Sequence, residues 1–99
     1  MRKGTTPTLT FKIPFEVSML KNAKATFRQG DIQLEKKLGD FETTENTLTI
    51  RLTQEETFLF RSDTQIKVQL RVVTLNGDAL ASDIFNIFVS ECLDNEVLE

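Results

Sequence analysis

Apolar and polar residues alternate over several short stretches of the chain, a pattern typical of strands that bury one face. The clearest stretch is 47–52, in which Leu48, Ile50 and Leu52 are predicted to point inward. Three further stretches alternate in the same way, at 8–13, 23–28 and 32–36. No apolar period of 3.6 residues extends over a useful length, so we expect short strands rather than long helices.

The residues between these stretches indicate how the strands are joined. Residues 29–31, Gln-Gly-Asp, predict a tight turn between two strands of a hairpin. Pro7 and Pro14 flank the stretch 8–13, which predicts a strand at the edge of a sheet, because proline cannot donate a ladder hydrogen bond. Residues 38–41 predict a bend or a short strand.

Two places predict a helical turn. Residues 53–56, Thr-Gln-Glu-Glu, match a capping box, in which the first hydroxyl and the last carboxylate each accept the other residue's backbone N–H. This turn should cross between two sheets, with Phe58 and Phe60 then pointing inward. The stretch 15–22 lacks alternation and predicts a helical turn or an irregular connection. The residues that it places near the core are Phe15, Val17 and Leu20.

Apolar stretches on both sides of Asn76-Gly77 predict a β-hairpin, because this pair readily takes the positive φ angles that a two-residue turn requires. Such a turn pairs Leu75 with Asp78, Val72 with Ala81, Leu70 with Asp83, Val68 with Phe85 and Ile66 with Ile87. The apolar faces of the two strands then coincide. Asp83 would lie on the inner face, where we expect its carboxylate to accept N–H bonds from the loop 79–82.

About seven short strands joined by turns predict an all-β fold, an antiparallel immunoglobulin-like β-sandwich with one or two short helical turns. The 99 residues should form one domain over 1–99, because two halves would each bury too little surface to fold alone. Six phenylalanines fall at strand spacing and are predicted to form the core, at positions 11, 27, 58, 60, 85 and 88.

Charge is unevenly distributed along the chain. Lys and Arg total 12 against 15 Asp and Glu. Four of the acids lie in an acidic tail at 90–99, namely Glu91, Asp94, Glu96 and Glu99. The rest of the chain is nearly neutral and its bases are scattered along the sequence, so we expect no nucleic-acid partner. The tail is either mobile or docks on a neighbour through Leu93, Val97 and Leu98, and the sequence leaves both alternatives open.

The residue types that usually carry catalysis are scarce. The chain has no His, which removes the usual general base and the commonest metal ligand. Glu55 and Glu56 are a candidate carboxylate pair, but consecutive residues of a helical turn diverge, so we interpret them as part of the helix cap. We predict no catalytic residues and no enzyme activity.

Two weaker candidates remain for metal or thiol chemistry. Oxygen ligands near the hairpin, from Asn76, Asp78 and Asp83, could suit Ca²⁺, but their spacing matches no known calcium loop. Cys92 is the only cysteine and has no His to activate it, so we interpret it as a small apolar filler. We therefore predict no metal site and no cofactor.

The beginning of the sequence does not read as a signal peptide. Met1-Arg2-Lys3 is basic, but the polar residues 4–8 follow where an apolar run would be needed. No segment reaches membrane-spanning length, so we expect no membrane partner. With a single cysteine, this predicts a protein that stays in the cytoplasm unless it leaves by lysis or with a partner.

Three parts of the chain resemble small, uncharacterised proteins encoded in phages and prophages of Gram-positive bacteria. They are 2–8 with Phe11 and Pro14-Phe15, 52–57, and 69–72 through 81–84. The chain is also loosely similar to the immunoglobulin-like N-terminal domain of phage baseplate upper proteins, although it lacks their receptor-carrying C-terminal part. The resemblance implies a phage context, with synthesis in the host bacterial cytoplasm followed by entry into a virion if the protein belongs to one. It supplies no functional residues.

The leading hypothesis is a non-enzymatic structural and interaction module of a phage virion, tail or baseplate. Its expected partners are other phage structural proteins, or further copies of itself, and an edge strand such as 8–13 could add to a partner's sheet. The alternative is a carbohydrate-binding or cell-surface-binding adhesion domain, which the absence of Trp and Tyr disfavours. A carboxylate-based enzyme is a third hypothesis and has no motif to support it.

Overall fold

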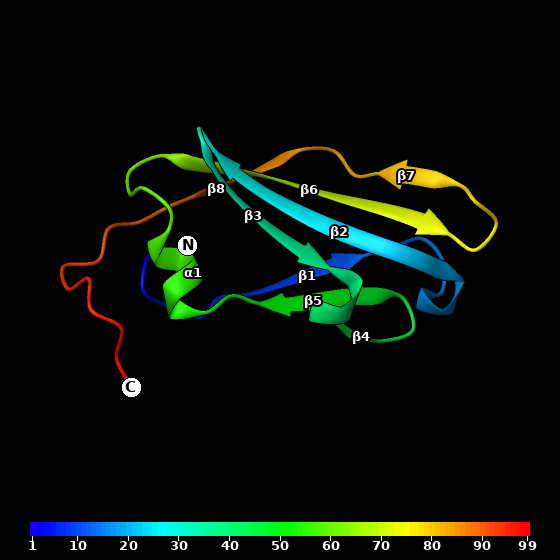
Figure 1. Cartoon of the computed structure of the whole chain (residues 1–99), viewed down its shortest axis with the longest axis horizontal. Helices are drawn as coiled ribbons and strands as arrows, with labels where there is room; N and C mark the ends of the chain where they lie inside the picture. The colour runs from blue at the N-terminus through cyan, green and yellow to red at the C-terminus, as the bar shows by residue number, and fades with distance from the viewer.

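Two antiparallel β-sheets face each other in the structure, a computed structural model that describes residues 1–99 (Figure 1). The smaller sheet has the order β1-β5-β4 and contains β1 (Thr8–Lys12), β4 (Glu42–Thr43) and β5 (Thr47–Arg51). The larger sheet has the order β3-β2-β6-β7, with β8 also paired to β6. Its strands are β2 (Leu20–Gln29), β3 (Ile32–Lys37), β6 (Gln65–Thr74), β7 (Ala79–Ala81) and β8 (Phe85–Phe88).

Each crossing between the two sheets is made through one short helical turn. The 3₁₀ turn η1 (Val17–Met19) follows β1, η2 (Leu38–Asp40) follows β3, and α1 (Gln54–Phe58) follows β5. The helical turns predicted near 15–22 and at 53–56 are confirmed, and the latter does cross between sheets. None of these helices is long and apolar enough to span a membrane.

The predicted immunoglobulin-like sandwich is confirmed by the strand order. Strands β1, β5 and β4 take the places of strands B, E and D of that fold, and β3, β2, β6 and β8 take those of C′, C, F and G. No strand corresponds to A, but Arg2 forms a parallel bridge with Ser90 beyond β8. Strand β1 lies at a sheet edge, as its flanking prolines predict.

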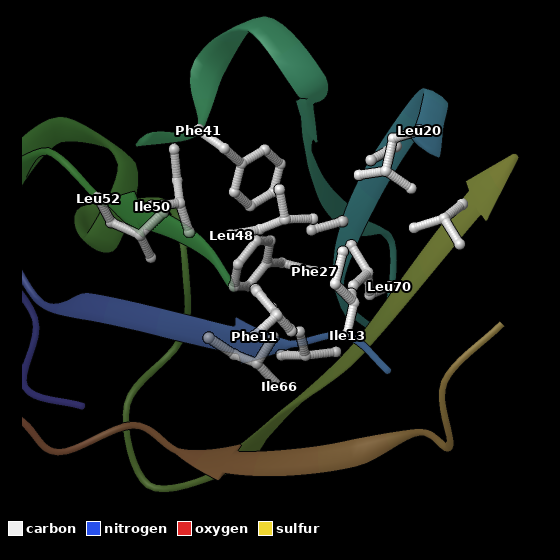
Figure 2. Packing of buried hydrophobic residues seen from close by; sticks show 14 of the residues in the cluster. Phe11, Ile13, Leu20, Phe27, Phe41, Leu48, Ile50, Leu52, Ile66 and Leu70 are labelled. Carbon is white, nitrogen blue, oxygen red and sulfur yellow. The ribbon is translucent and has the colours of Figure 1, made fainter. Parts of the chain in front are cut away.

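The core lies between the inner faces of the two sheets, as Figure 2 shows. The inward residues predicted in β5 and just after it, Leu48, Ile50 and Leu52, are all buried. Sixteen buried apolar residues form one cluster, including four phenylalanines, at positions 11, 27, 41 and 60. The Phe41 ring meets the Phe11 ring edge to face at a centroid distance of 6.2 Å, which links the η2 crossing to β1.

The prediction of a core position is wrong for three of the six phenylalanines, Phe58, Phe85 and Phe88. Phe85 and Phe88 are 39% and 52% exposed. Phe85 pairs with the buried Val68 and faces inward, but it lies in an edge strand; its ring lies 5.9 Å from the Phe11 ring between centroids. Phe88 pairs with the exposed Gln65 and therefore lies on the outer face of the sheet. Phe58 is half-buried, with its ring against Gly4.

The predicted hairpin register is confirmed for β8 and wrong for β7. Val68 pairs with Phe85 as predicted, whereas Val72 pairs with Leu80 instead of Ala81. The turn has three residues: the Gly77 N–H donates to the Thr74 carbonyl oxygen at 3.0 Å, and Gly77 takes a φ of 88°. The pairing of β6 with β7 is therefore shifted by one residue from the predicted register. A β-bulge at 82–84 adds one residue to the second strand and restores the predicted register in β8.

Ser82 holds this bulge in place. Its N–H donates to the Leu70 carbonyl oxygen at 2.8 Å, and its hydroxyl accepts the Leu70 N–H at 3.0 Å. The hydroxyl also donates to the Asp83 carbonyl oxygen at 2.9 Å. Asp83 lies in this bulge and is exposed, and its carboxylate accepts no hydrogen bond from the loop, so the prediction of an inner-face carboxylate that accepts loop N–H bonds is wrong.

Helix α1 fastens segments from both ends of the chain. The buried Thr57 hydroxyl accepts the Gly4 N–H at 2.9 Å and lies 3.1 Å from the Thr5 carbonyl oxygen. The Gln54 side chain donates to the Leu98 carbonyl oxygen at 2.8 Å and accepts the Leu98 N–H at 2.9 Å. The acidic tail is therefore held against α1 at the end of the molecule away from β7 (Figure 1).

The bulge leads to contrasting expectations for two neighbouring residues. Ser82→Ala should lower the free energy of unfolding by about 1 kcal/mol, because the Leu70 N–H loses its acceptor. Asp83→Ala should change it by less than about 0.5 kcal/mol, because that side chain is exposed. Urea unfolding of the two variants and the parent protein measures both values. A larger loss for Asp83→Ala than for Ser82→Ala would contradict this assignment of the bulge.

Candidate functional site

The adjacent carboxylates Glu55 and Glu56 diverge. Glu55 is exposed, whereas Glu56 completes the predicted capping box: the Thr53 hydroxyl accepts the Glu56 N–H at 3.1 Å, and the Glu56 carboxylate accepts the Thr53 N–H at 2.9 Å. The capping interpretation is confirmed. The carboxylate also forms an ion pair with Lys36, a residue of β3 on the inner face of the larger sheet.

This ion pair joins the larger sheet to the helix that leaves the smaller one. Burial alone would raise the pKa of Glu56, but the hydrogen bond and the charge of Lys36, together with the bond from the Thr53 N–H, outweigh it and lower the pKa below 4.5. Because the pKa is lower in the folded protein, Glu56 stabilises the fold above pH 4.5, and this contribution is lost as the pH falls through the folded-state pKa. Glu56 therefore has a structural role and stays ionised at neutral pH.

Glu56→Gln tests this role, because Gln retains the capping bonds and removes the charge. At pH 7 we expect a loss of about 1 kcal/mol in the free energy of unfolding, since Lys36 keeps its charge without a partner. The difference from the parent protein should shrink as the pH is lowered from 5 to 3. Unfolding curves across this range measure it, with the exposed Glu55→Gln as control. An unchanged difference at pH 3 would contradict the assignment.

The other residues considered for chemistry are not assembled into a site. No group of three His, Cys, Asp or Glu side chains is placed to hold a metal ion. Asp78 uses its backbone in the turn, where its N–H donates to the Thr74 hydroxyl at 3.1 Å. Cys92 is a free thiol and is half-buried, outside the core cluster.

The structure instead gathers basic side chains on the outer face of the larger sheet. Across β3, β2 and β6, Lys37, Lys24 and Arg71 lie directly opposite one another, and Arg28 pairs with Lys67 further along the same two central strands. Paired residues share a face of the sheet, and neighbouring strands are only about 4.8 Å apart. We call this surface the cationic face. It comprises Lys24, Thr26, Arg28, Gln33, Glu35, Lys37, Lys67, Gln69 and Arg71.

The cationic face differs in charge from the rest of the protein. It holds five of the 12 Lys and Arg residues and one of the 15 Asp and Glu residues, which leaves seven basic against 14 acidic residues elsewhere. Glu35, the one acid, lies 3.4 Å from the Lys24 ammonium. The other four basic side chains have no carboxylate within ion-pair distance. This part of the surface is therefore strongly positive on a chain of net charge −3.

Two open depressions occupy this outer face and share Lys24 and Arg71 as lining residues. One, of about 320 Å³, is mostly polar and runs over β3, β2 and β6 to Ile84. The other, of about 280 Å³, is mostly apolar and runs over β2, β6 and β7, where Ala79 and Ala81 leave space beside Val73. No aromatic side chain lines either depression. The basic residues thus border both a polar and an apolar hollow.

This surface was not predicted from the sequence, in which the basic residues are scattered over several stretches. A local signal was present: Lys24 and Arg28 fall on the polar side of one alternating stretch, and Lys67 and Arg71 fall on the polar side of another. What was missing was the pairing of β2 with β6, which are separated in the chain by three other strands and α1. Without that pairing, the two basic strand faces could not be placed side by side.

The chain matches no protein-family model, no curated protein and no solved structure. The resemblance to phage proteins therefore stays a prediction. The function has to be argued from the cationic face and its surroundings.

Proposed function

We propose that this protein is a non-enzymatic interaction module associated with a phage tail, baseplate or other part of the virion, and that the cationic face is its main contact surface. The observation that carries the proposal is the row of Lys37, Lys24 and Arg71 across three adjacent strands, without a compensating row of acids. The phage context is supported by the resemblance of the sequence.

The basic side chains of the cationic face repel one another. Like charges directly opposite one another in a sheet destabilise it, and burial of two such charges without a partner costs more. A complementary acidic surface converts the same repulsion into attraction and also steers the encounter between the two molecules. The cationic face is therefore better suited to a bound state than to isolation, as expected for an assembly component.

The non-enzymatic part of the proposal is supported by the state of the carboxylates. A general acid among carboxylates needs a raised pKa, whereas the pKa of Glu56 is lowered and its oxygens are engaged with Lys36 and Thr53. The chain has no His that could take over that role. A binding role needs none of this chemistry.

A carbohydrate-binding adhesion domain is the alternative, and the polar depression is where a sugar would fit. Its amide nitrogens are already engaged, since the Gln33 amide donates to the Glu35 carboxylate at 2.7 Å and the Gln69 amide donates to the Ser82 carbonyl oxygen at 3.0 Å. Charge is therefore the more accessible feature of the face. This favours an acidic partner over a neutral glycan.

Analysis of purified particles tests the proposal. In an induced lysate separated on a density gradient, the protein should sediment with phage particles, as measured by quantitative mass spectrometry. Lys24→Glu with Arg71→Glu should lower its amount in particles by about tenfold or more, the effect expected from losing about 1.4 kcal/mol of binding.

The matched control is Lys12→Glu with Lys21→Glu, which changes the net charge equally at exposed positions off the cationic face. This control should enter particles at the parental level. Absence of the parent protein from particles would overturn the virion assignment. Binding of neutral glycans on an array, lost with Gln69→Ala and retained with the charge reversals, would favour the adhesion alternative.

A further inference from the structure

The acidic tail is opposite in charge to the cationic face. Residues 90–99 carry four carboxylates and no basic side chain. Three apolar side chains lie between those carboxylates and are uncovered: Leu93 is 98% exposed, Leu98 69% and Val97 39%. A short segment that alternates carboxylates with exposed aliphatic groups suits a surface that offers cations beside an apolar hollow.

The tail is held in place before any partner arrives. The Gln54 side chain makes two hydrogen bonds with the Leu98 backbone, and the Asp94 carboxylate accepts the Glu96 N–H at 3.0 Å. These contacts fix the backbone and leave the side chains of Leu93 and Leu98 uncovered.

A single molecule does not satisfy its own cationic face with this tail. The tail lies beside α1 (Figure 1), and none of its carboxylates forms an ion pair with any basic side chain. Its hydrogen bonds to the folded body involve the Gln54 side chain and the N-terminal segment. In that segment Arg2 donates to the Glu91 carbonyl oxygen, the Lys3 N–H donates to the Ser90 carbonyl oxygen, and the Ser90 N–H donates to the Met1 carbonyl oxygen. Both charged surfaces are therefore free at the same time, which makes them available to a second copy.

The two surfaces also agree in size. Lys24 and Arg28 are four residues apart in β2, so the cationic face extends about 13 Å along the strands. The ten residues of the tail span up to about 33 Å when extended, once the two hydrogen bonds between Gln54 and Leu98 open. The tail can therefore cross the basic rows and still place a leucine in the apolar depression beside Val73 and Ala79.

We infer that the acidic tail of one copy binds the cationic face of another, so that copies associate head to tail. The inference deepens the proposed function, on which it rests for the role of the face, by naming a second copy as the partner. The contact joins two different surfaces, so each copy keeps one free tail or one free face after pairing. Such a contact continues into a ring or a filament.

Self-association of the full chain tests the inference. In sedimentation equilibrium at 50 mM salt, the protein should associate as its concentration rises towards about 1 mM, and the apparent Kd should weaken about tenfold or more at 500 mM salt, because screening acts on charged contacts. A face variant, Lys24→Glu with Arg71→Glu, and a tail variant, Asp94→Lys with Glu96→Lys, should each be monomeric.

Mixing the two variants gives the decisive result. The face variant keeps an intact tail and the tail variant keeps an intact face, so one productive contact forms between them. The expected product is a 1:1 complex that does not grow further, whereas the parent protein continues to larger species. A chain that carries all four reversals should associate again, because its face is then acidic and its tail basic. The Lys12→Glu, Lys21→Glu variant should associate like the parent, and circular dichroism checks that every variant is folded.

Three outcomes would overturn the inference. They are a parent protein that stays monomeric up to about 1 mM, association that survives in both variants, and variants that remain monomeric when mixed. The first outcome, together with binding of a short DNA duplex that the face variant loses, would assign the face to a polyanion instead. Head-to-tail association of a protein that is absent from particles would contradict only the virion assignment, so the two failures are distinguishable.

Discussion

The pairing of β2 with β6 is the contact on which the rest of the molecule depends. Ala25 opposite Leu70 and Phe27 opposite Val68 supply the centre of the core, and the residues between them are forced onto the outer face. Because side chains in a strand alternate with a period of two, one register sets both the apolar interior and the cationic exterior. A slip of one residue would bury Lys24 and expose Phe27. Packing of the core thus fixes the register that places the basic side chains side by side on the outer face.

The crossings between the sheets complete this arrangement with local interactions. The capping box at Thr53 starts α1, and the Glu56 carboxylate of the same box reaches Lys36 in the opposite sheet. Thr57 and Gln54 of this one helical turn then hold segments from the two ends of the chain. A helix of five residues therefore links both sheets, the N-terminal segment and the acidic tail, although too short to be stable alone.

Local pattern predicted most of the fold because its signals lie within a few residues of each other. The alternation of Leu48, Ile50 and Leu52 and the capping box each describe one element, and both are confirmed. The predictions that failed concern relations between elements. Asn76-Gly77 suits a two-residue turn, but the chain forms a three-residue turn followed by a bulge at 82–84, and Asp83 in that bulge is exposed. Phe85 is exposed because its strand lies at a sheet edge, and Phe88 is exposed because it lies on the outer face of that strand.

The sequence by itself determined that this chain forms short strands with one buried face, crosses between two sheets through a capped helical turn, and separates a nearly neutral body from an acidic tail. Only the tertiary structure decided that the bases of β2, β3 and β6 stand together. The physical reason is that a strand's periodicity assigns each side chain to one of two faces, whereas neighbours across a sheet depend on pairing between distant segments. The basic residues form one charged surface only after these strands have paired.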